Sequence, residues 1–455
     1  MKDAMHLIFS LVTLLWLQPV WSAETLHDTH EECITEPVFE GNVCTLQANR
    51  DAKTGVILIH GLDGSYEDWQ KTIPALAKNF HVLVFDLPGF GKSDKGSQDY
   101  TPTRYARLAQ FLSNRYFQDK SYHIVGHSMG GAIALRFASQ QPQRFQRLVL
   151  IDAAGMLHPL VMTKFQAGSM LQRKSGVPQT REFAERLSGR ILEKIDGLPF
   201  SPNDIVNTAL GRERLLQGGP SYIAAMGLAE ENFSYAIASV TAPTLVLWGD
   251  NDLTTPLRTG RVLAGNMQHA ELEIIADAGH EPMRDQPERT NTLILKHLLA
   301  SDAALANTYA QDSSQSPLAS KRDGKCAGKS GMVFEGDYRT IDLRDCSNIT
   351  IRNARIGNLN AVNSKVELTD TDILSKKVGL QAENSDITMT NGKITGDIAI
   401  ESMLSRLDLA GVYLKGTQDA VRGESSKLTF SLCRVKSPHM DGPLHDFRNM
   451  INGTL

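Results

Sequence analysis

The sequence lacks three features that would place it in common functional classes. No charge of one sign predominates, because 47 Lys and Arg stand against 51 Asp and Glu, a formal net charge of −4 over 455 residues. The chain as a whole therefore has no general attraction for nucleic acid or anionic lipid. Beyond the first residues no apolar run approaches the ~20 positions that cross a bilayer, which excludes a polytopic membrane protein. No Cys-x-x-Cys pair or His and Cys cluster has zinc spacing, and we predict no metal site.

The one long apolar run lies at the start of the chain. Residues 7–17 are apolar except for one Ser and one Thr, a stretch too short to span a bilayer but suited to a signal peptide. Val20 and Ser22 supply small residues at positions −3 and −1 of a possible cleavage after Ser22. Cleavage after Ala23 is the alternative. We predict a signal peptide over 1–22, a periplasmic or extracellular location and no transmembrane span after cleavage. An uncleaved anchor or a buried segment are the other interpretations.

Cysteine is scarce, and its distribution agrees with export. Of the five cysteines, Cys33 and Cys44 lie near the predicted mature N-terminus, and Cys326 and Cys346 lie near the start of the C-terminal region. We expect two local disulfides among these four, although spacing alone leaves the pairing open. Cys433 is then a free, buried thiol.

The first 300 residues alternate short aliphatic runs with helical patterns. Such runs are typical of strands buried in a parallel sheet, and the alternation predicts an α/β doubly wound fold. Ligands of such sheets bind beyond the carboxyl ends of the strands, where the Gly-rich turns of this sequence fall. The runs cover residues 56–59, 81–85, 122–125, 148–151, 244–248 and 272–275.

The sharpest of these turns reads Gly-His-Ser-Met-Gly-Gly over residues 126–131. It follows a strand and opens a helix, the context of a nucleophile elbow, so Ser128 is the candidate nucleophile. A serine hydroxyl needs a base and an orienting acid. Asp250 and Asp252 follow one later strand, and His280 follows the next, giving the chain order Ser, Asp, His.

These motifs resemble the α/β-hydrolase superfamily of esterases, lipases and carbon–carbon bond hydrolases, over residues 37 to 300. The quoted matches are His60-Gly61, Asp-x-Pro-Gly-x-Gly-x-Ser over 86–93, the 126–131 turn, Gly-x-x-Asp over 249–252, and Gly279-His280. The resemblance implies the following roles: nucleophile Ser128, general base His280, orienting acid Asp252, and oxyanion-hole N–H groups of Leu62 and Met129. Asp250 is the rival acid, and His60, Gly61 and His127 shape the pocket by bonding to turns.

The resemblance also implies a domain plan. Residues 23–300 form the hydrolase domain, with a helical cap at about 156–240 in which Phe183, Leu187 and Ile191 make one apolar helix face. A small, polar stretch over 301–321 reads as a linker.

A repeat fills the C-terminal region, 322–455. Five segments share the frame Ser, apolar at +2, +4 and +9, and their Ser-to-Ser steps are 17, 21, 20 and 21 residues. Strands that recur at about 21 residues predict a solenoid whose stacked coils form one core. The region resembles a right-handed parallel β-helix. The segments begin at Ser347, Ser364, Ser385, Ser405 and Ser426.

Serine in place of the aspartate nucleophile of dehalogenases points to acyl transfer. The leading hypothesis is an exported serine hydrolase of small-molecule or lipid carboxylic esters, needing no cofactor, because intracellular carbon–carbon bond substrates are not expected outside the cytoplasm. The β-helix would bind a substrate or surface, such as a polysaccharide or cell surface, or would present the enzyme to it. The alternatives are a carbon–carbon bond (vinylogous diketone) hydrolase and a surface-binding protein with an inactive hydrolase scaffold.

Overall fold

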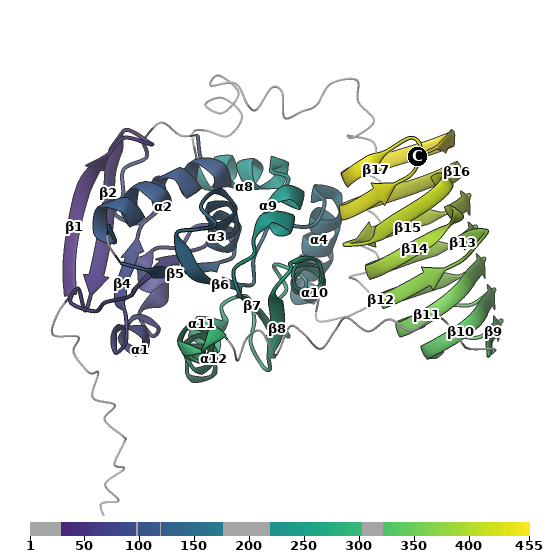
Figure 1. The fold of residues 1–455 in the computed structure, drawn as a ribbon, viewed down its shortest axis with the longest axis horizontal. Helices are drawn as coiled ribbons and strands as arrows, with labels where there is room; N and C mark the ends of the chain where they lie inside the picture. Colours follow the sequence, from purple (N-terminus) through teal and green to yellow (C-terminus); the bar gives the residue numbers. More distant parts are fainter. Residues whose placement is uncertain (1–28, 97–98, 119, 176–218, 303–321) are drawn as a thin grey trace, which may run out of the picture.

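The computed structural model describes residues 29–96, 99–118, 120–175, 219–302 and 322–455. They form an eight-stranded sheet with its helices, followed by a nine-stranded all-β region (Figure 1). The predicted signal peptide, the helix face at residues 183–191 and the predicted linker from residue 303 onwards lie outside these ranges. None of the helices within them is both long enough and apolar enough to cross a bilayer.

The N-terminal sheet follows the predicted α/β pattern. Its order is β1-β2-β4-β3-β5-β6-β7-β8; the strands from β3 to β8 run parallel, and β1 and β2 form an antiparallel hairpin at one edge. The strands are β1 (Thr29–Glu36), β2 (Gly41–Ala48), β3 (Gly55–Ile59), β4 (His81–Phe85), β5 (Tyr122–His127), β6 (Phe145–Ile151), β7 (Thr244–Gly249) and β8 (Ala270–Ile275).

Helices cover both faces of this sheet, which is why its central strands are continuously apolar. Successive strand side chains point to opposite faces, so Ile57 packs in one layer with α2, α3 and α10, and Leu58 in the other with α1 and α12. The helices are η1 (Tyr66–Trp69), α1 (Ile73–Ala77), α2 (Pro102–Tyr116), α3 (Met129–Gln140), α10 (Leu257–Asn266), α11 (Pro282–Asp285) and α12 (Pro287–Leu299).

Three described helices come from the predicted cap segment between β6 and β7. They are α4 (Pro159–Ser175), α8 (Pro220–Glu230) and α9 (Ser234–Ser239). The buried side chains of α8 and α9 join the same core as α2 and α3. Helix α4, with α10, lies on the side of the sheet that faces the C-terminal β region (Figure 1).

The C-terminal β region stacks parallel strands in the register that the repeat predicts. The +4 positions pair in succession, from Ile351 through Leu368, Met389 and Leu409 to Phe430, and all five side chains are buried in one core. This stacking is compatible with the predicted solenoid. The strands are β9 (Asp323–Ala327), β10 (Val333–Arg344), β11 (Ile349–Val362), β12 (Lys365–Leu374), β13 (Val378–Glu383), β14 (Asp386–Met403), β15 (Arg406–Ala410), β16 (Tyr413–Lys436) and β17 (Asp441–Thr454).

The serines of the repeat also have a structural role. Backbone N–H groups of one repeat donate to the serine hydroxyl of the next, as Ser364 N does to Ser385 Oγ and Ser385 N to Ser405 Oγ. All three side chains are buried, so each bond satisfies a backbone donor at a turn that water does not reach. The last strand departs from the repeat: β17 pairs antiparallel with β16 and covers the edge that the stack would otherwise leave open.

Two disulfides join the four cysteines that the sequence groups locally. Cys33 pairs with Cys44 across the β1–β2 hairpin, Cys326 pairs with Cys346, and Cys433 is a buried free thiol.

We predict one titratable thiol per unfolded, unreduced chain and five after reduction. Closing a loop of 11 residues restricts the unfolded chain, so a Cys33→Ser and Cys44→Ser double variant should lose about 3 kcal/mol of unfolding free energy in urea titrations. Three thiols before reduction would contradict the pairing.

Candidate active site

The turn after β5 holds Ser128 in a backbone conformation that the motif requires. Ser128 has φ 54° and ψ −120°, a region that L-residues rarely adopt. The turn is tight, because a Cβ at Gly126 would lie 2.2 Å from the Gly130 carbonyl oxygen, and a Cβ at Gly130 would lie 2.2 Å from that of Ile59. Only glycine fits at these two positions, and the result is a serine side chain raised at the carboxyl edge of the sheet.

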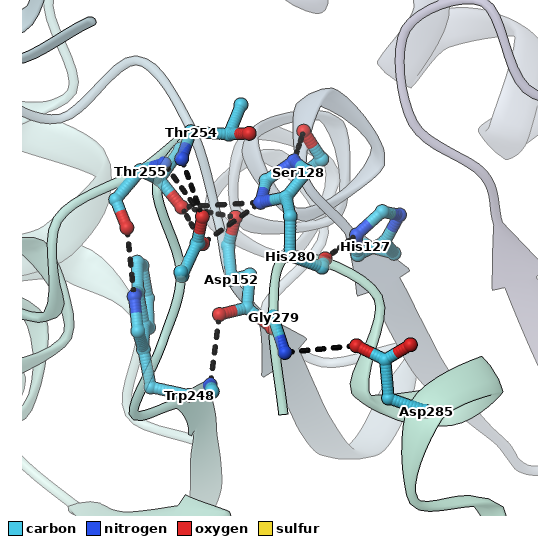
Figure 2. Close-up of polar contacts among 11 residues, drawn as sticks. His127, Ser128, Asp152, Trp248, Thr254, Thr255, Gly279, His280 and Asp285 are labelled. Atoms are coloured by element: carbon cyan, nitrogen blue, oxygen red, sulfur yellow. Dashed lines mark hydrogen bonds and ion pairs between the residues drawn. The ribbon is translucent and has the colours of Figure 1, made fainter. Parts of the chain in front are cut away.

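Three side chains from distant parts of the chain meet at this edge, and Figure 2 labels two of them, Ser128 and His280. His280 Nε2 lies 2.9 Å from Ser128 Oγ, and His280 Nδ1 lies 2.8 Å from Asp252 Oδ2. The serine is 7% exposed and the Asp252 side chain is fully buried, whereas 20% of the His280 side chain is exposed. The order hydroxyl, imidazole, carboxylate is the one that activates a serine.

Asp252 is oriented by the loop that follows it. Its Oδ1 accepts hydrogen bonds from the backbone N–H groups of Thr254 (2.7 Å) and Thr255 (3.0 Å), and its Oδ2 accepts one from the Thr255 hydroxyl. Burial by itself would raise the pKa of Asp252, but the hydrogen bond and charge of His280, with these donors, outweigh burial and hold the pKa below its usual value. The carboxylate is therefore ionised beside the imidazole.

Asp250 occupies a different environment from Asp252. It is exposed, and its Oδ1 accepts a hydrogen bond from the side chain of its neighbour Asn251. The contact with His280 belongs to Asp252, which is the acid that the family spacing implies.

Asp152 is a residue of this site that the sequence reasoning did not identify. It follows β6 with φ 44°, its Oδ1 accepts from Gly249 N (3.0 Å), and its buried Oδ2 has no partner in the described part of the chain. Burial, and then the nearby charge of Asp252, raises the pKa of Asp152 well above its usual value. Its place at the carboxyl end of a strand was the available signal.

Asp152, Asp252 and His280 are also the group of potential metal ligands that the described ranges contain, with donor atoms within 4.8 Å of one another. The oxygens of Asp252 and Nδ1 of His280 already bond to each other and to the Thr254–Thr255 loop. The donor set therefore fits a hydrogen-bonded relay better than a cation.

Two further histidines beside the site bond to turns. His60 donates from Nδ1 to the Gly61 carbonyl (2.7 Å) and accepts at Nε2 from Leu87 N (2.9 Å). His127 Nε2 lies 2.6 Å from the carbonyl oxygen of His280. Burial lowers the pKa of both, that of His127 to about 3, so both rings are neutral at pH 7.

The predicted oxyanion-hole residues flank Ser128. Met129 is the first residue of α3 and directly follows the serine. The loop that carries Leu62 passes beside the serine, since a Cβ at Gly61 would lie 3.0 Å from Ser128 Cβ. The structure therefore places both residues next to Ser128, and their role in an oxyanion hole stays a prediction.

The fold agrees with comparisons to known proteins. The profile described as the alpha/beta hydrolase fold matches residues 55–287. The monoacylglycerol lipase abhd6-B of Xenopus laevis is 26% identical over 255 residues, covering 54% of this chain and 75% of that protein. Lipase 3 of Moraxella sp. (strain TA144) is 28% identical over 245 residues, with coverages of 52% and 75%.

A third relative has a different kind of substrate in its name. The 2-hydroxy-6-oxononadienedioate/2-hydroxy-6-oxononatrienedioate hydrolase 1 of Pseudomonas putida is 26% identical over 254 residues, covering 54% of this chain and 89% of that protein. The profile spans half of the chain and includes Ser128, Asp252 and His280. The chain belongs to the α/β hydrolase fold family.

Proposed function

We propose that this protein is a serine hydrolase that cleaves carboxylic esters through an acyl-enzyme on Ser128. The observation that carries the proposal is the continuous relay from Ser128 Oγ through His280 to the buried Asp252. The names of two relatives, a monoacylglycerol lipase and a lipase, favour a lipid or small-molecule ester as the substrate.

The chemistry follows from the positions of these atoms. His280 Nε2 removes the hydroxyl proton as Ser128 Oγ attacks the ester carbonyl, and Asp252 stabilises the imidazolium that forms. The N–H groups of Leu62 and Met129 bind the oxyanion, a contribution of ~3 kcal/mol per donor. His280 then protonates the leaving alcohol. A water molecule, deprotonated by His280, attacks the acyl-enzyme and releases the acid, which restores Ser128.

The N-terminal leader and the two disulfides support a proposal about location. Disulfides persist in oxidising compartments. Each half of the chain contains one: Cys33–Cys44 in the N-terminal half and Cys326–Cys346 in the C-terminal half. We infer that the protein is exported to the periplasm or beyond the cell. Its C-terminal β region would then bind a substrate or cell surface, or present the enzyme to one.

Hydrolysis of a carbon–carbon bond is the second candidate, and the Pseudomonas putida relative is the observation that favours it. Both reactions can use the same serine, so the substrate must separate them. We expect a panel of p-nitrophenyl esters of increasing acyl length to be turned over, and a vinylogous diketone to be left intact. Faster cleavage of the diketone than of every ester would reverse the assignment.

A fluorophosphonate probe tests the enzyme class itself. Because His280 activates Ser128, the folded protein should be labelled at Ser128, as peptide mass spectrometry would report. If a folded, unreduced sample is neither labelled nor hydrolytic, the hydrolase half is a scaffold and the surface-binding interpretation replaces this proposal.

A further inference from the structure

The joint between the two halves of the chain lies close to the loop that orients Asp252. Helix α10 begins two residues after Thr255, and Pro256 at its N-cap fixes the backbone between them at φ −67°. The first turn of α10 is therefore joined to Thr255 through a single residue of restricted φ. This residue donates to both oxygens of the Asp252 carboxylate.

Arg258, in that first turn, is held by the C-terminal β region. Its guanidinium donates to Asp408 Oδ2 (2.7 Å), Thr390 Oγ1 (2.8 Å), the Met389 carbonyl (2.8 Å) and the Asp408 carbonyl (3.1 Å). The side chain is only 17% exposed. A planar guanidinium with four acceptors in fixed places has little freedom to rotate or shift.

The other end of α10 is fixed to the same region. Asn391 Nδ2 donates to the Arg261 carbonyl (2.8 Å), and Asn266 Nδ2 donates to Asn391 Oδ1 (3.1 Å). Helix α10 and the C-terminal β region pack closely here, because a Cβ at Gly265 would lie 2.5 Å from Asn391 Nδ2.

Apolar packing continues across the joint. Ala410 and Leu432 of the C-terminal β region are buried in the same core cluster as the strands and helices of the hydrolase half. A polar contact adds to this packing, since His158 N, just before α4, donates to Ser431 Oγ (2.9 Å). A shared core and part-buried hydrogen bonds describe a fixed joint rather than two domains that move independently.

We propose that the C-terminal β region positions the active site: through Arg258 it holds α10, and thereby the Thr254–Thr255 loop that orients Asp252. This inference rests on the proposed serine hydrolase function. Arg258 and Asp408 touch neither His280 nor Ser128, so they are positioning residues. This positioning role differs from the role of a tether. Removing a tether would change where the enzyme acts but not its rate on a soluble ester.

The test uses the full-length chain and a soluble p-nitrophenyl ester. Asp408→Ala should lower kcat by about 10-fold with KM unchanged, because a misplaced acid weakens transition-state stabilisation without affecting ester binding. Rates are expressed per active site titrated with the fluorophosphonate probe, so that a smaller folded fraction is not counted as lost activity. Asp408→Asn keeps one hydrogen-bond acceptor for Arg258 and should restore part of the rate.

Asp323→Ala is the matched control. Its partner is Arg339, within the C-terminal β region, whose Nε lies 2.9 Å from Asp323 Oδ1, and breaking this exposed pair should leave kcat unchanged. A cycle with Asp252→Asn separates positioning from general stability: if Asp408 acts through Asp252, Asp408→Ala should cause no further loss of kcat in that background.

Each result decides the proposal. An unchanged kcat per site in Asp408→Ala, or a further 10-fold loss in the Asp252→Asn background, would overturn it while leaving the serine hydrolase function intact. A wild-type chain that neither binds the probe nor cleaves esters would instead remove the proposed function, and this inference with it.

Discussion

Replacing Ser128 with alanine is expected to lower kcat for ester hydrolysis by about 10⁶-fold and to abolish fluorophosphonate labelling. The hydroxyl is the only group of this residue that reaches His280 Nε2, at 2.9 Å, and alanine removes it while keeping the Cβ. Steady-state hydrolysis of a p-nitrophenyl ester and mass spectrometry of the labelled protein measure the two effects. Residual turnover within 10-fold of wild type would mean that another nucleophile acts.

Two companion variants separate lost chemistry from lost structure. Ser139 lies on α3, the helix that follows Ser128, and its hydroxyl donates to the Arg136 carbonyl. Ser139→Ala should therefore keep full activity and labelling. Ser128→Gly should be inactive yet at least as stable as wild type, because glycine adopts the φ of 54° without the strain of a side chain. A thermal unfolding midpoint for Ser128→Gly below that of wild type would contradict a strained serine.

Local patterns predict the elements that carry the site, because each depends on neighbours in sequence. The continuous run before Gly126 indicates a strand buried on both faces, and the small residues after Ser128 indicate the tight turn and close helix that the structure contains. The repeat likewise predicts its own register, since Leu368 stacks between Ile351 and Met389. In both cases the pattern records a packing requirement that repeats along the chain.

Other features depend on residues that are far apart and follow no period. Arg258 and Asp408 are 150 positions apart, and nothing in either surrounding sequence marks them as a pair. Asp152 looks like an ordinary residue after a strand, and its raised pKa arises only when folding buries it beside Asp252. Pairing of β17 with β16 likewise follows no pattern in the sequence, because β17 lies beyond the last segment of the repeat and runs antiparallel to β16.

Asp252→Asn should lower kcat by about 10⁴-fold with little change in KM. The substitution conserves shape, but the carboxamide can offer an N–H to His280 Nδ1, which favours the imidazole tautomer that cannot accept a proton from Ser128. It also removes the buried negative charge that stabilises the imidazolium in the transition state. Because Thr254 and Thr255 donate to this side chain, the asparagine oxygen can retain those bonds, and the fold should persist.

Asp250→Asn is the matched control, the same chemical change two residues earlier. Asp250 is exposed and bonds to Asn251, so this variant should keep its activity within about 2-fold, as expected for a surface change without a partner in the relay. The difference of ~10⁴ between the two variants assigns the acid. Equal losses in both would show that the loop as a whole matters, and a larger loss in Asp250→Asn would transfer the role of acid to Asp250.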